Sequence, residues 1–75
     1  MNMSMLQVSL YHRKFNQYTN KEESTRIIGE NAKDIHEATL IVKSFECAMM
    51  ELNAEANGIK YAIDVTDENG ELKWV

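Results

Sequence analysis

The chain carries one thiol and two imidazoles, the side chains from which a nucleophile and its general base could be built. Cys47 and His36 lie eleven residues apart in one stretch with helical periodicity. Eleven residues of α-helix span about 16 Å, which excludes a direct contact within one chain. Nothing in the sequence directs His12 toward Cys47. We therefore interpret Cys47 as a small apolar residue and predict that the protein is not an enzyme.

Acidic side chains crowd the segment near the end of the chain, where a calcium loop is the chemistry to consider. The acids are Asp64, Asp67, Glu68 and Glu71. When Gly70 is placed at the invariant glycine of an EF-hand loop, Val65 falls at the first ligand position and the required glutamate would lie beyond Val75. The pattern therefore predicts a solvated acidic turn that could meet a basic partner, and no metal ion or cofactor.

A basic and aromatic segment at residues 11–18 is the candidate for nucleic-acid binding. In a strand, Tyr11, Arg13 and Phe15 would share the sheet face away from the helix, where the rings could stack on unpaired bases. Arg13 and Lys14 would then contact phosphates. The alternative is that the rings pack across a dimer seam or on neighbouring strands. We favour this alternative because few basic residues elsewhere could extend a nucleic-acid-binding surface.

Charge is divided unevenly along the chain. Residues 1–29 carry a net charge of +2 and residues 30–75 a net charge of −6, which together give −4. An acidic body disfavours nonspecific binding to nucleic acid and suits docking onto a basic surface.

One long helix, expected over residues 34–58, is the central element that would position these side chains. Asp34 and Glu37 have the spacing of a capping box, in which each side chain accepts a hydrogen bond from the other residue's backbone N–H. Asn57 and Gly58 supply a residue that tolerates the left-handed conformation at a helix end. Apolar residues at helical spacing form a broad core-facing side: Ile35, Ala38, Ile41, Val42, Phe45, Ala48, Met49, Leu52 and Ala56.

A second apolar stripe lies on the opposite flank of this helix. It comprises Leu40, Cys47, Met50 and Ala54, and three of these repeat every seven residues, as in a helix pair. We interpret the stripe as a surface for self-association or for a partner protein. The alternative is a set of scattered exposed apolar residues, which are common.

Strand patterns flank the helix on both sides. Alternating apolar residues predict strands over residues 5–15 and 59–66, with further strands at 25–29 and 71–75. Residues 19–24 read as a polar loop, and residues 67–70 as a turn with Gly70 at positive φ. The order strand, strand, helix, strand, strand predicts a single two-layer α+β domain over residues 1–75, with the helix on one face of a mostly antiparallel sheet. The order of the strands within the sheet stays open.

A domain of this size buries only about 60% of the surface of its unfolded chain and is marginal without a disulfide, a metal or an oligomer. One cysteine forms no internal disulfide, so we predict a homodimer.

With no apolar run of about 20 residues and no basic start before a hydrophobic block, we expect a cytoplasmic protein that does not enter membranes. The build resembles small accessory proteins of bacteria and their phages, some of which inhibit host enzymes or defence complexes. We expect a non-catalytic protein that binds itself and another protein; a single-stranded nucleic-acid-binding module is the alternative.

Overall fold

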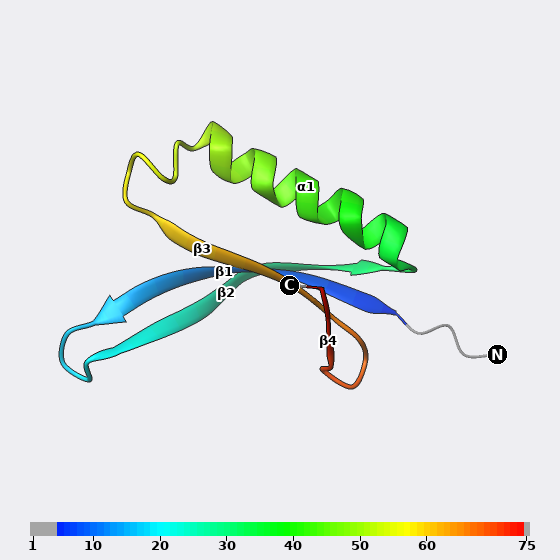
Figure 1. Ribbon diagram of the computed structural model, residues 1–75, viewed down its shortest axis with the longest axis horizontal. Helices are drawn as coiled ribbons and strands as arrows, with labels where there is room; N and C mark the ends of the chain where they lie inside the picture. Colours follow the sequence, from blue (N-terminus) through cyan, green and yellow to red (C-terminus); the bar gives the residue numbers. More distant parts are fainter. Residues whose placement is uncertain (1–4, 75) are drawn as a thin grey trace.

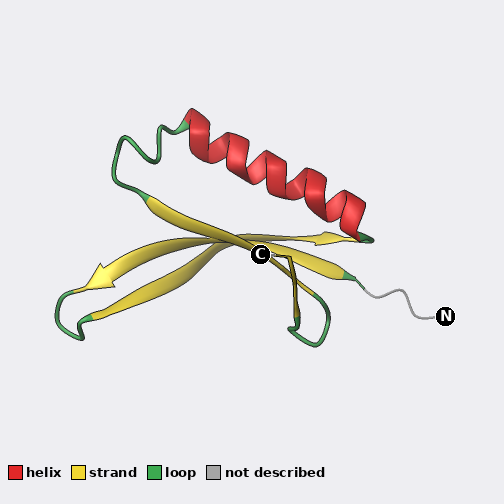
Figure 2. Ribbon diagram, viewed as in Figure 1, coloured by secondary structure: helices red, strands yellow, loops and turns green. Residues whose placement is uncertain are grey.

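The computed structural model describes residues 5–74, with only the backbone described at Trp74. One helix lies over one face of a four-stranded antiparallel sheet (Figures 1 and 2). The elements in chain order are β1 (Leu6–Asn16), β2 (Lys21–Ala32), α1 (Ile35–Glu51), β3 (Lys60–Thr66) and β4 (Leu72–Trp74). The sheet order is β2-β1-β3-β4, so the first strand lies in the middle of the sheet. The predicted two-layer α+β class is confirmed.

The core lies between α1 and the two central strands. Val8 and Leu10 of β1 and Val65 of β3 point toward the helix, and Phe45 and Met49 are among the helical residues that meet them. The other buried core residues are Ala32, Ala38, Val42 and Ala54. With so few large side chains, burial on this one face has to stabilise the whole domain.

The start of α1 follows the predicted capping pattern with one shift. The Asp34 carboxylate accepts a hydrogen bond from the Glu37 N–H at 2.8 Å, as expected. The Glu37 carboxylate accepts from the Lys33 N–H at 3.1 Å, one residue earlier than expected. The two acids still satisfy backbone donors at the positive end of the helix dipole.

The end of α1 corrects the predicted helix of residues 34–58, which is seven residues too long at this end. Asn53 takes a left-handed conformation, with φ 52°. The Asn53 N–H then donates to the Met50 carbonyl, and the Ala54 N–H donates to the Met49 carbonyl, both at 3.0 Å. This is a Schellman motif, which satisfies the last carbonyls and turns the chain.

The expected stop at Gly58 does occur, but it closes a separate short turn. The Gly58 N–H donates to Glu55 at 3.1 Å and the Ile59 N–H to Ala54 at 2.8 Å, with Gly58 at φ 70°. The chain therefore makes two Schellman closures in succession before β3 begins.

Strand β2 is far longer than the predicted residues 25–29. A four-residue turn at 17–20 connects it to β1, and the Asn16 side chain accepts from the Tyr18 and Thr19 N–H groups. Asn20 has positive φ. Of the expected loop, residues 19–20 lie in the turn, whereas residues 21–24 pair with β1, with Asn16 opposite Lys21.

The domain is more extended than a compact domain with the same number of residues. Its radius of gyration is 13.9 Å, against about 11 Å for a compact chain of this length. One cause is visible in Figure 1, where the β1–β2 hairpin projects past the end of the helix. We call residues 14–23 of this hairpin, which lie beyond the last pair of β1 with β3, the arm.

Replacing Asn53 tests its role at the helix end. We expect Asn53→Ala to lower the free energy of unfolding by about 1 kcal/mol, because a Cβ without a local hydrogen-bonding group disfavours positive φ. Asn53→Gly keeps this conformation accessible and should unfold at nearly the wild-type urea concentration. Equal losses for both variants would contradict the role of Asn53.

Candidate functional site

The predicted second stripe of the helix is exposed at three of its four positions. Leu40 is 55% exposed and Met50 is 75% exposed. Cys47 is an exposed free thiol whose Sγ lies 3.8 Å from a Glu51 carboxylate oxygen. Ala54 was wrongly placed on this stripe, because the turn at Asn53 directs it into the core, where it is 2% exposed. We call Leu40, Cys47 and Met50 the outer stripe.

An open groove of about 810 Å³ lies between the C-terminal end of α1 and the strands beneath it. Its apolar lining comes from the helix end, the following loop and the start of β3: Met49, Met50, Ala54, Ala56, Ile59 and Tyr61. Its polar lining comprises Arg13, Glu22, Asn53, Glu55 and Lys60. A volume of this size and an apolar lining with a few polar groups are typical of binding sites.

The groove follows from the places where the elements end. The helix stops at Glu51, the loop returns to β3 at Lys60, and the arm bends away below them (Figure 1). Three groove residues were predicted as site residues from the sequence: Met50 and Ala54 for association and Arg13 for nucleic-acid contact. The groove itself was not predicted, because Ile59 and Tyr61 read as ordinary strand residues. The available signal was a set of apolar residues around the Asn53 and Gly58 turns that no helix face could bury.

The basic and aromatic segment lies along β1 and its cations stand beside carboxylates. Arg13 lies 3.4 Å from Glu22, and Lys14 is directly opposite Glu23 in the ladder. Arg13 is also opposite Lys60 on β3, a like-charge pair that the nearby Glu22 offsets. The Arg13–Glu22 pair is exposed and therefore contributes little stability. These neighbours weaken the positive potential that phosphate binding would need.

The aromatic members of that segment differ in exposure. Phe15 is 52% exposed, whereas Tyr11 is half-buried, between Arg26 and Ala62 in the ladders. Tyr18, at the tip of the arm, is 99% exposed. The arm therefore presents two aromatic rings that the described part of the chain leaves largely uncovered.

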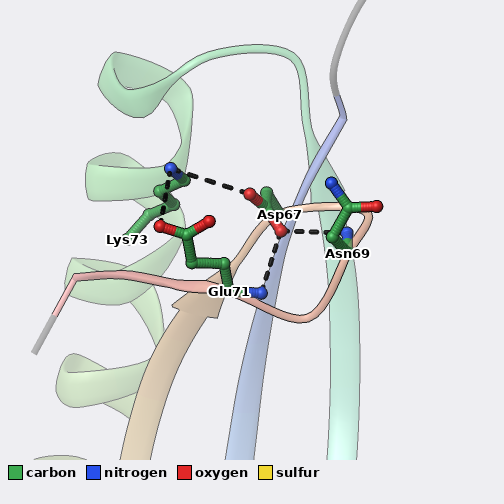
Figure 3. A network of polar contacts seen from close by, with 4 residues as sticks. All are labelled: Asp67, Asn69, Glu71 and Lys73. Atoms are coloured by element: carbon green, nitrogen blue, oxygen red, sulfur yellow. Dashed lines mark hydrogen bonds and ion pairs between the residues drawn. The ribbon is translucent and has the colours of Figure 1, made fainter.

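The predicted acidic surface divides into two parts. Figure 3 shows the Asp67 carboxylate accepting from the N–H groups of Asn69 and Glu71, each at 2.9 Å, inside the β3–β4 turn. The Lys73 ammonium lies 3.6 Å from Asp67 and 3.7 Å from Glu71. Gly70 has positive φ, as predicted. Glu68 is exposed in the same turn. The acidic charge that holds the turn together is mainly that of Asp67, through the hydrogen bonds that it accepts.

Asp64 lies apart from this turn, within β3. It is directly opposite Ser9 of β1, on the sheet face away from the helix. One of its carboxylate oxygens, Oδ1, is buried with no hydrogen-bond donor among the described residues. The four acids therefore do not form one continuous surface.

The turn lowers the pKa of Asp67 below its ordinary value of 3.8. The backbone N–H of Glu71 is the largest cause, and the N–H of Asn69 and the charge of Lys73 act in the same direction, while partial desolvation opposes them. Hydrogen bonds donated to the ionised carboxylate favour the charged form.

The two histidines and the cysteine are divided between the sheet and the helix. His12 lies opposite Tyr61 in the sheet, whereas Cys47 and His36 are exposed on the helix. Over residues 5–74, no cluster of three His, Cys, Asp or Glu side chains could hold a metal ion. Within the same range, no helix is long and apolar enough to cross a membrane. The groove and the outer stripe are thus the surfaces on which a functional argument can be built.

Comparison with known proteins found no match to any protein-family model, curated protein or solved structure.

The lowered pKa of Asp67 predicts a pH-dependent contribution to stability. The charged carboxylate stabilises the fold above pH 3.8, and this contribution is lost as the pH falls through the lowered pKa. Urea unfolding should therefore show wild type losing its advantage over Asp67→Asn on acidification. Lys73→Met should retain most of this behaviour, because the Glu71 N–H is the larger cause. A constant difference between wild type and Asp67→Asn down to about pH 2 would contradict this account.

Proposed function

We propose that this chain is a small non-catalytic accessory protein that acts by binding another protein, and that it does so as a homodimer. The observation that carries the proposal is the open apolar groove at the end of α1. Met50 belongs both to this groove and to the outer stripe, so the two meet at this residue.

Exposure of the groove residues supports a macromolecular ligand. Met50 is 75% exposed, and Ile59 and Tyr61 are 38% and 36% exposed. Methionine is flexible and polarisable, which suits a surface that adapts to an apolar side chain of a partner. The groove is open rather than enclosed, and it has charged residues of both signs at its margin, as in the polar rim of a protein interface.

The shape of the domain supports self-association. Only one face of the sheet is covered by α1, and the radius of gyration exceeds that of a compact chain. A second copy would cover surface that this small core leaves exposed. An exposed free thiol at Cys47 suits a reducing compartment, and we place the activity in the cytoplasm.

Photo-crosslinking tests the groove as the partner site. A photoreactive amino acid at Met50 or Tyr61 should give discrete higher-mass products with another protein in the source cell, because both side chains line the groove. The same probe at Ser44, which is exposed on α1 but does not line the groove, serves as the control. Once the partner is isolated, Met50→Asp should weaken binding at least about tenfold. Products of equal yield at Ser44 would contradict the assignment of the groove.

Light scattering after size-exclusion chromatography tests the homodimer. The expected mass is close to twice the 8.7 kDa of one chain. The apparent mass should fall toward that of one chain on dilution, because association depends on protomer concentration. A single-chain mass at every concentration up to the millimolar range would refute the dimer.

A further inference from the structure

The outer edge of β2 is the longest unpaired strand edge in the described structure. β2 pairs with β1 on one side, and no described strand lies on its other side. An unpaired edge presents backbone donors and acceptors that can pair with another strand. A bulge interrupts this edge at Ile27, because Leu10 pairs with Ile28 while Tyr11 pairs with Arg26. The longer uninterrupted part is therefore the six residues from Lys21 to Arg26.

Half of this part of β2, from Lys21 to Glu23, lies where the sheet is thinnest. The ladder of β1 with β3 ends at Arg13, so the arm beyond it is only two strands wide. Two-stranded ribbons are marginally stable in water, and three or more strands are needed for independent stability. Figure 1 shows the arm projecting beyond the helix, where α1 does not cover it. A further strand at the β2 edge would therefore stabilise the arm.

The charge pattern of this segment is complementary to itself. Glu22 lies two residues before Ser24, and Arg26 lies two residues after it. A two-fold axis perpendicular to the sheet and passing between two Ser24 residues would place each Glu22 opposite Arg26 of the second copy. Residues 22, 24 and 26 alternate to one face of the strand, so these side chains would meet on the same face.

Other two-fold registers along the uninterrupted segment lose this complementarity. An axis at Lys21, Glu22, Glu23 or Arg26 places that charged residue opposite its own copy. The axis at Glu22 also places Lys21 opposite Glu23, but the two Glu22 carboxylates then face each other at its centre. An axis at Thr25 places Glu22 opposite Ile28 and Glu23 opposite Ile27. The pairing centred on Ser24 is therefore the register that the charges favour.

The two charged residues are available for such a contact. The Arg26 guanidinium fills the space beside Gly29 that a Cβ at that position would occupy, and within the described residues it belongs to no ion pair. Glu22 contacts Arg13 at 3.4 Å, and a carboxylate has acceptor capacity for a second guanidinium. Both Glu22 and Arg26 are exposed.

We propose that two copies of this chain pair antiparallel through the β2 edges, centred on Ser24, with Glu22 of each copy opposite Arg26 of the other. The inference rests on the homodimer of the proposed function and assigns its seam. The two four-stranded sheets become one continuous sheet, and the arm becomes four strands wide. Both helices and both grooves then lie on the same side of that sheet.

A cysteine at position 24 tests the register. Residues directly opposite in an antiparallel pair have Cβ atoms about 4.5–5.5 Å apart, within reach of a disulfide. In a Cys47→Ser background, Ser24→Cys should form an intermolecular disulfide with diamide as the oxidant, each pair of thiols losing two protons and two electrons. Thr25→Cys in the same background is the matched control, because its two copies are off the axis and should crosslink at least about tenfold more slowly.

Charge reversal tests the pairing by complementation. Glu22→Arg and Arg26→Glu should each raise the dimer dissociation constant at least about tenfold, because like charges replace both ion pairs. An equimolar mixture of the two variants should recover a heterodimer, since each arginine then faces a glutamate. Arg13→Ala should leave the dimer intact, which separates the seam from the loss of the Arg13–Glu22 contact.

The outcomes distinguish the seam from the dimer itself. Selective crosslinking at position 24 with recovery in the mixture supports the proposal. A wild-type dimer with equal crosslinking at 24 and 25, or without recovery, overturns the β2 seam and leaves the homodimer standing. A wild-type monomer overturns both.

Discussion

The structure depends on the unequal lengths of the two ladders that β1 makes with its neighbours. On one side β1 pairs with β2 along its whole length, from Leu6 to Asn16, and on the other side it pairs with β3 only up to Arg13. Where both ladders are present, the sheet is wide enough to support α1 and the core. Where only one is present, the chain forms the two-stranded arm, and β2 keeps a long free edge.

The second constraint is the point at which α1 ends. Asn53 turns the chain in a left-handed conformation and closes a Schellman motif, so Ala54 enters the core and Met50 remains at the surface. A helix continued to Gly58 would have carried Ala54 along the outer stripe. Instead, the short second turn and the start of β3 complete a groove beside Met50. One backbone conformation thus determines which apolar residues are buried and which are left for a ligand.

The two proposals use different parts of this construction except at Glu22, which lines the groove and also pairs across the proposed seam. The groove lies on the helix side of the sheet and consists mainly of apolar side chains, which suits a partner protein. The β2 edge offers backbone groups and a self-complementary charge pattern, which suits a second copy. The apolar lining of the groove lies outside the seam, so a dimer of this kind would leave that lining open to partners in both copies.

Most of the fold could be predicted from local sequence patterns. The alternation of Tyr61, Ile63 and Val65 predicted β3, and the Asp34 and Glu37 spacing predicted the start of α1. These features depend on neighbouring residues, whose periodicity and capping are visible in the chain itself. The acidic turn was placed correctly for the same reason, since Gly70 takes positive φ there.

Contacts between distant segments decided the rest. Lys21 to Ser24 read as a polar loop, yet they form strand because β1 offers them a ladder. The sequence predicted a helix stop at Gly58, and only packing of Ala54 into the core shows why the chain turns earlier, at Asn53. The groove likewise needs the helix end, the loop and β3 together.

The sequence by itself determined the types of element and their order, because these follow from interactions a few residues apart. The tertiary structure decided strand order, strand length and the position of the candidate site, because these depend on which distant surfaces meet.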